Sequence, residues 1–101
     1  MKQLKQYAVE VLEGHQHGRY GKDYYFGMYL WGFNKKDAED VGIEELANMS
    51  FREINERCID DRQKPWQMWH QQEHEREFGE DAPIGIENAE MFFTCRAYIE
   101  K

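Results

Sequence analysis

The stretch of sequence that decides the fold is YYFGMYLWGF, residues 24–33. Apolar residues stand at both parities of this stretch, which predicts a β-strand with two apolar faces. The first face takes Tyr24, Phe26, Met28 and Leu30, and the second takes Tyr25, Tyr29, Trp31 and Phe33. Such a strand either lies in the centre of a sheet with both faces covered, or exposes a row of aromatic rings to a partner.

Two further stretches show the alternation of a strand. Residues 6–12 place aromatic and β-branched side chains on one face, which suits a pleated surface, and residues 91–99 alternate in the same way. Residues 13–23 contain three glycines and predict the loop after the first strand. The sequence Ile-Gly-Ile at residues 84–86 leaves room for a short fourth strand.

Helical signals occupy the middle of the chain. Asn34 is a predicted N-cap for a short first helix, which we expect Gly42 to interrupt. Ser50 with Glu53 three residues later is a capping-box pattern, which predicts a second helix over about residues 51–62.

A third helix is predicted between Pro65, which suits a first turn, and Gly79, which suits a helix end. Residues 80–90, with Pro83 and Gly85, are then expected to form a loop. Strands and helices fall in separate blocks, in the order β-β-α-α-α-β, which is typical of the α+β class. We therefore expect a small antiparallel sheet of three to four strands with two to three helices packed on one face.

Length and charge limit the functions that this chain can have. A chain of 101 residues fits a single domain, residues 1–101, and its net charge of -7 repels phosphate backbones, so direct nucleic-acid binding is not expected. No apolar run approaches the roughly 20 residues of a membrane span, and no signal-peptide pattern opens the chain. We expect a cytoplasmic protein with no membrane contact.

Nucleophilic catalysis has little support in the sequence. Ser50 is the only serine and is assigned to a helix cap, while Cys58 falls on the apolar stripe of its predicted helix. Cys58 and Cys95 form no CxxC pair, so both are expected to be reduced core residues. The sequence therefore indicates a protein that is not an enzyme and needs no cofactor.

The histidines offer one alternative to that interpretation. They fall in two clusters, His15 with His17 in the predicted loop and His70 with His74 in the third helix. Either spacing puts two imidazoles on one side of the chain, as a divalent metal requires. If the loop folded over the helix, the four rings would surround zinc or nickel in a metal-binding module or a metal-dependent enzyme.

A structural interpretation competes with the metal site. Trp66, His70, His74 and Phe78 are spaced by four residues, so the two histidines would simply line the edge of an aromatic core. Gln71 stands where the HExxH motif of metalloproteases needs glutamate, which removes the usual general base.

Carboxylates and aromatic rings are the candidate binding residues. The carboxylates cluster within residues 37–45 and are Asp37, Glu39, Asp40, Glu44 and Glu45. A solvated helix face would explain them, but spaced carboxylates also steer a basic partner. Exposed aromatic residues would add short-range affinity, and the candidates are Tyr25, Tyr29, Trp31, Trp66 and Trp69.

Three functions follow as hypotheses. The first is an acidic binding or inhibitor protein that engages a basic, nucleic-acid-handling protein, of the small nucleic-acid-mimicking kind that viruses and mobile elements encode. The second is the histidine-based metal module. The third is a structural or assembly protein in which the strand at residues 24–33 packs against a second copy in a homodimer.

Overall fold

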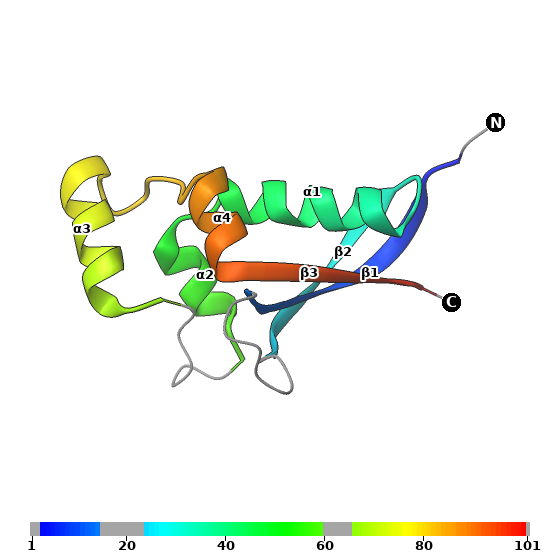
Figure 1. Ribbon diagram of the computed structural model, residues 1–101, viewed down its shortest axis with the longest axis horizontal. Coiled ribbons are helices and arrows are strands. Elements are labelled where there is room, and N and C mark those ends of the chain that lie inside the picture. The colour runs from blue at the N-terminus through cyan, green and yellow to red at the C-terminus, as the bar shows by residue number, and fades with distance from the viewer. Residues whose placement is uncertain (1–2, 15–23, 60–65, 101) are drawn as a thin grey trace.

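Three strands form an antiparallel sheet in this computed structural model, which describes residues 3–14, 24–59 and 66–100 (Figure 1). They are β1 (Lys5–Glu13), β2 (Tyr24–Gly32) and β3 (Phe93–Ile99), arranged in the order β2-β1-β3. The predicted α+β class and antiparallel sheet are confirmed, although the described residues form four helices where two to three were expected. The apolar strand β2 lies at an edge of the sheet with β1 beside it, so it is not the central strand that one of the two alternatives required.

The register of the sheet explains which apolar residues are buried. Val9 pairs with Met28 on one side and Ala97 on the other, and all three face the helices. A β-bulge follows, because Val11 pairs with Phe26 whereas Leu12 pairs with Tyr24. Tyr25 is therefore the extra residue of β2.

The bulge turns Tyr25 away from the face predicted for it. Tyr25 is only 4% exposed, and its ring contacts that of Phe93 at a centroid distance of 6.0 Å. Strict alternation along residues 24–33 had grouped Tyr25 with Tyr29 and Trp31, which are both exposed. That grouping is wrong for Tyr25, because one inserted residue shifts the facing of the chain on one side of the bulge.

Helix α1 (Lys35–Ala47) crosses one face of the sheet. Asn34 caps it as predicted, since its side-chain oxygen accepts a hydrogen bond from the Asp37 amide at 2.8 Å. The predicted interruption at Gly42 is wrong, because the helix runs through this residue without a break. Gly42 is buried, and a Cβ atom there would lie 2.9 Å from Cys95 Sγ, so the glycine lets α1 approach the sheet closely.

Helix α2 (Phe51–Arg57) begins at the predicted capping box. Ser50 Oγ accepts from the Glu53 amide at 3.1 Å, and the Ser50 amide donates to Glu53 Oε1 at 3.5 Å. The helix ends earlier than the expected residue 62, because Cys58 already has extended backbone angles.

Helix α3 (Met68–Phe78) ends at Gly79 as predicted, with a φ of 101° that favours glycine. It begins at Met68, and Pro65 lies outside the described residues. Gln71 ties the helix to its neighbours: its Oε1 accepts from Asn55 Nδ2 at 3.1 Å and from Trp66 Nε1 at 3.2 Å.

Helix α4 (Ile86–Phe92) replaces most of the loop predicted for residues 80–90. It also includes Met91 and Phe92, so β3 begins two residues later than the predicted strand. Residues 84–86 form no strand; instead the Ile84 amide bonds to the Met49 carbonyl at 2.9 Å. Gly85 is the N-cap and offers no side chain to the helix, so no capping pattern announced it.

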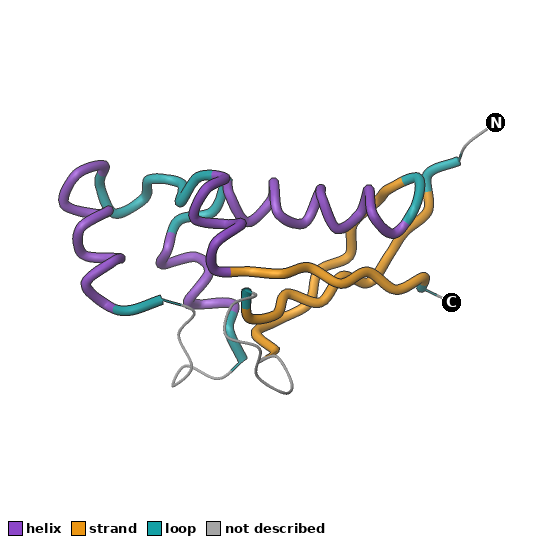
Figure 2. The backbone as a smooth tube through the Cα atoms, viewed as in Figure 1, coloured by secondary structure: helices purple, strands orange, loops and turns teal. Residues whose placement is uncertain are grey.

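The helices form a layer on one face of the sheet, with α3 at one end of the molecule (Figures 1 and 2). The hydrophobic core lies between the layers and continues under α2, where Phe51 packs edge to face on Trp66 at 4.6 Å. The opposite face of the sheet carries no helix among the described residues. In the part of the chain that the structure describes, a helical layer thus covers one face of the sheet, and we call the opposite face the open face.

The close approach at Gly42 predicts a measurable coupling with Cys95. Gly42→Ala is expected to lower the free energy of unfolding by about 1–2 kcal/mol, although alanine favours helix, because the new Cβ overpacks against Cys95. Urea unfolding should show that the losses of Gly42→Ala and Cys95→Ala are not additive. The free energy of unfolding of the double variant should fall by at least about 1 kcal/mol less than the sum of the two single decreases. Glu45→Ala on the exposed side of α1 is the control and should add independently to Cys95→Ala. Additive losses for Gly42→Ala would show that this contact does not set the helix position.

Candidate functional site

The two described histidines of the predicted metal site are engaged in packing. His74 shares a hydrogen bond of 3.1 Å with the Pro83 carbonyl, and its ring contacts those of Phe51 and Phe78 at 5.0 Å each. His70 packs against Trp69 at 4.3 Å. His15 and His17 lie outside the described residues, and within the described part of the chain no three metal-binding side chains come together.

The thiols of Cys58 and Cys95 and the hydroxyl of Ser50 are poorly placed for nucleophilic chemistry. Burial, with a smaller contribution from the charge of Glu39, raises the pKa of the Cys95 thiol to about 12. Burial also raises the pKa of Cys58. The Ser50 hydroxyl is occupied by the helix cap. Both cysteines are therefore protonated at neutral pH, and a protonated thiol is a weak nucleophile.

The aromatic candidates for partner binding separate into buried and exposed residues. Trp66 is only 5% exposed and Tyr25 is equally buried, so neither can contact a partner. This corrects their selection from the sequence, which could not distinguish a core tryptophan from a surface one. Trp69 is exposed on α3, whereas Tyr29 and Trp31 are exposed on the open sheet face.

The five carboxylate candidates of α1 also fall into two groups, those bonded to backbone amides and those exposed to solvent. Asp37 Oδ2 accepts a hydrogen bond from the Phe33 amide at 2.9 Å, which secures the start of the helix. Glu39 Oε2 accepts from the Ala97 amide of β3 at 3.0 Å. The other three, Asp40, Glu44 and Glu45, are exposed to solvent. Two of the five predicted binding residues therefore hold the fold together.

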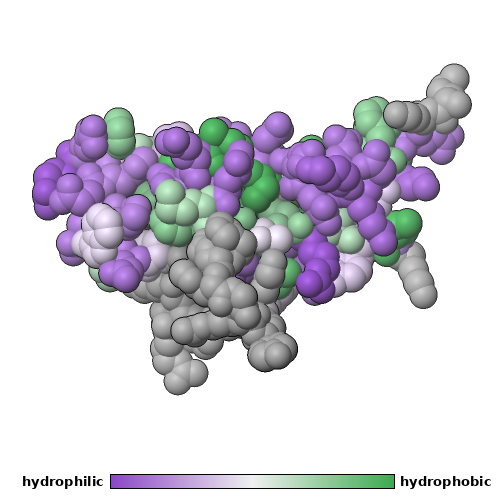
Figure 3. All heavy atoms as spheres, viewed as in Figure 1, coloured by the Kyte–Doolittle hydropathy of each residue, from purple (hydrophilic) through white to green (hydrophobic). Residues whose placement is uncertain are grey.

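Two of the exposed carboxylates of α1, Asp40 and Glu44, line a groove against α4, which we call the acidic groove. It has a volume of about 430 Å³ and is lined by Lys36, Asp40, Ile43, Glu44, Ile86 and Glu90. Asp40 pairs with Lys36 at 2.8 Å, but both side chains are exposed, so the pair contributes little stability. Three carboxylates face one ammonium group, and Figure 3 shows apolar surface among hydrophilic residues over α1 and α4.

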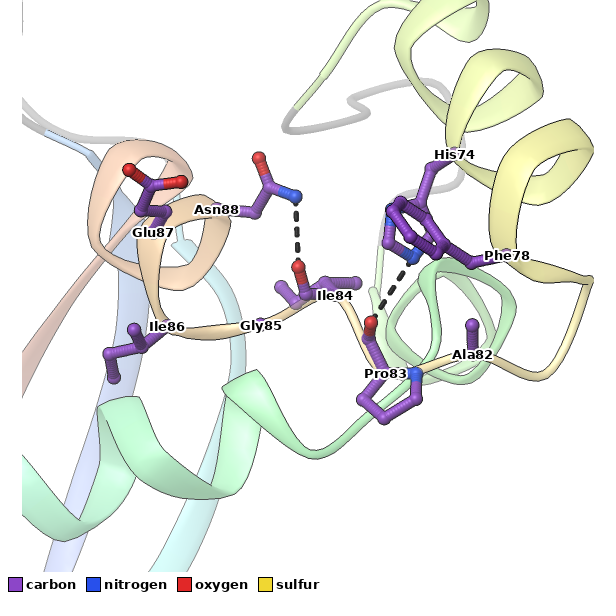
Figure 4. Close-up of a pocket in the computed structure, with 9 residues that line it drawn as sticks. All are labelled: His74, Phe78, Ala82, Pro83, Ile84, Gly85, Ile86, Glu87 and Asn88. Atoms are coloured by element: carbon purple, nitrogen blue, oxygen red, sulfur yellow. Dashed lines mark hydrogen bonds between the residues drawn. The ribbon is translucent and has the colours of Figure 1, made fainter.

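A second hollow adjoins the acidic groove, and we call it the apolar cleft (Figure 4). It lies between α3 and α4, has a volume of about 610 Å³, and is lined by His74, Phe78, Ala82, Pro83, Ile84, Gly85, Ile86, Glu87 and Asn88. Figure 4 shows His74 and Phe78 on the α3 side and the first residues of α4 on the other. Phe78 is 62% exposed and Ile86 is 47% exposed, so apolar surface is available to a partner.

Hydrogen bonds fix the segment between the two walls of the apolar cleft. The Pro83 carbonyl is held by His74, and the Ile84 carbonyl accepts from Asn88 Nδ2 at 2.9 Å. Ile86 lines both hollows, so the apolar cleft and the acidic groove meet at this residue.

Sequence reasoning missed the contribution of α4 to both hollows. Ile86 and Glu90 were placed in a predicted loop, although Glu87, two residues after Gly85, is an acidic residue of the kind that favours the first turn of a helix. Phe78 was noted only as part of a core stripe. The short length of α4 and its lack of a side-chain cap explain the omission.

Comparisons of the chain with family models, with curated proteins and with solved structures find no match. Among the helices of the described residues, none is both long and apolar enough to cross a membrane. Function is therefore inferred from the geometry of the surface.

The raised pKa of Cys95 predicts a loss of stability at alkaline pH. The unfolded thiol ionises near its ordinary value of 9.0, whereas the folded thiol stays protonated up to about 12. The contribution to stability is therefore complete below pH 9 and is lost as the pH rises towards 12. The free energy of unfolding, measured in urea, should decrease between about pH 7 and about pH 10. This decrease should be larger by about 1 kcal/mol for the wild type than for Cys95→Ala. Equal decreases in the two proteins would contradict the prediction.

Proposed function

We propose that this chain is a non-enzymatic binding protein that engages a basic, amphipathic segment of a protein partner. The observation that carries the proposal is that Ile86 lines both the apolar cleft and the acidic groove, which places the two hollows next to each other. A segment with apolar side chains next to Lys or Arg would fill both hollows together.

Charge supplies the long-range part of this recognition. The chain has a net charge of -7, and the exposed carboxylates of Asp40, Glu44 and Glu90 concentrate negative potential at the groove. Such a surface steers a cationic partner and raises its association rate, with a strong dependence on salt. The exposed Lys36–Asp40 pair is weak enough for an incoming guanidinium to replace Lys36.

The apolar cleft supplies the short-range part of the recognition. Its volume of about 610 Å³ lies within the range of roughly 300–1,000 Å³ usual for ligand sites. Burial of an apolar side chain there would also cover Phe78 and Ile86. A fully buried Leu or Phe side chain contributes about 1.5–3 kcal/mol, enough to distinguish an amphipathic segment from a merely charged one.

Basic segments of this kind are common on proteins that hold nucleic acid, because phosphates are bound by Lys and Arg. A protein that occupied such a segment would compete with the nucleic acid, and inhibition is the consequence that we propose. The support for this step is the acidity of the groove.

Charge reversal in the groove tests the proposal. Glu44→Lys with Glu90→Lys should weaken binding of a synthetic amphipathic Lys/Leu peptide at least about tenfold in calorimetry at low salt. The control, Glu56→Lys with Glu100→Lys, changes the net charge equally at exposed positions outside both hollows, and should change affinity less than about threefold. Equal losses in both double variants would show that only net charge matters, and the groove would lose its role.

The apolar cleft has its own test. A Lys/Ser peptide of the same charge should bind the wild type at least about tenfold more weakly than the Lys/Leu peptide. Ile86→Ser should remove most of this difference while leaving the salt dependence of binding unchanged, since the carboxylates remain. An unaltered preference for the Lys/Leu peptide in Ile86→Ser would place its apolar contacts elsewhere.

A further inference from the structure

The open face of the sheet, opposite α1, carries exposed aromatic rings. The side chain of Val9 faces the helices, so Ala8 and Glu10 lie on the open face. Ala8 pairs with Tyr29 on one side and Tyr98 on the other. Leu12 at one end of this face is buried. The other described strand residues of the open face are Gln6, Ala8, Glu10, Tyr24, Gly27, Tyr29, Trp31, Thr94, Arg96 and Tyr98.

The relief of the open face suits interdigitation. Ala8 is a small residue flanked by two tyrosines, and in the next row Gly27 and Arg96 flank Glu10. The face is therefore low at Ala8, with a tyrosine ring on either side of it. A second sheet packs about 10 Å away when rings from each side fill low positions on the other.

The polar groups of the open face are held in place within it. Arg96 Nη1 donates to Tyr98 Oη at 3.2 Å, and the Tyr98 hydroxyl donates to Glu10 Oε2 at 3.4 Å. One guanidinium and one carboxylate thus stand side by side among the described residues of this face. Within β1, β2 and β3 the two charges on this face cancel, whereas the chain as a whole has a net charge of -7.

The charge and the exposed aromatic area of the open face favour a second copy of the chain as its partner. A basic partner would find no excess of carboxylates, whereas a second copy would meet the surface with little of the repulsion expected from two chains of charge -7. Tyr24, Tyr29, Trp31 and Tyr98 are 42%, 64%, 57% and 41% exposed. These rings alone expose on the order of 400 Å², about half of the roughly 800 Å² per partner of a standard interface.

We propose that two copies of this chain pack face to face through their open sheet faces, about a two-fold axis. Such an interface is isologous, so Arg96 of each copy can meet Glu10 of the other. The acidic groove and the apolar cleft belong to the helical layer, so they face outward in the pair. Dimerisation and the proposed binding of a basic segment are thus independent and can fail separately.

Sedimentation equilibrium of the full chain at up to about 100 μM tests the inference, and the wild type is expected to form a dimer. Tyr29→Ser with Trp31→Ser should weaken the dimer at least about tenfold, with an unchanged circular dichroism spectrum because both side chains are exposed. Trp69→Ser is the matched control: it removes an equally exposed tryptophan from α3 and should leave the dimer intact.

A charge swap tests the arrangement within the interface. Arg96→Glu alone should weaken the dimer, because carboxylates then meet across the two-fold axis. Glu10→Arg combined with Arg96→Glu should restore much of the association. A wild type that stays monomeric would overturn the proposal, as would a dimer that survives Tyr29→Ser with Trp31→Ser. A monomer whose tryptophan fluorescence is quenched by single-stranded oligothymidylate, with the quenching lost in Tyr29→Ser with Trp31→Ser, would also overturn it and would assign the face to base stacking.

Discussion

The close contact between α1 and the sheet at Gly42 is the constraint on which the rest of the structure depends. Without a side chain at this position, the helix reaches the level of Cys95 and Val9. With the helix in this position, Glu39 accepts a hydrogen bond from the amide of Ala97 and covers part of the outer edge of β3. The same close position brings α1 beside α4, and the acidic groove is the space left between their exposed faces.

Local signals in the sequence were sufficient for most of the fold. The strand periods, the Asn34 cap and the capping box of Ser50 each depend on residues a few positions apart, and each has a structural counterpart. Contacts between residues far apart in the sequence could not be predicted from such local patterns. Gly42 looked like a helix breaker because its contact, Cys95, lies far along the chain and only the folded structure brings the two together. The bulge at Tyr25 depends on cross-strand register, which a single strand does not specify.

The candidate site was less predictable than the fold, because composition does not say how a side chain is used. The five acidic residues of α1 looked equivalent, yet Glu39 serves the sheet edge while Glu44 faces solvent. The aromatic candidates were expected to stand beside the carboxylates, but Tyr29 and Trp31 lie on the opposite layer. One predicted composite surface is therefore two surfaces of different character, one charged and one neutral.

The strand order also determines when this chain can fold. The central strand β1 comes first in the sequence, and one of its two partners, β3, comes last. During synthesis, β2 can pair with β1 early, but the other edge of β1 stays bare, and α1 lacks the Cys95 surface on which Gly42 rests. Contacts between such distant segments are slow to form, and an unpaired central strand promotes aggregation. The chain is therefore expected to complete its fold only after residues 93–99 have left the ribosome, with chaperones protecting the half-built sheet until then.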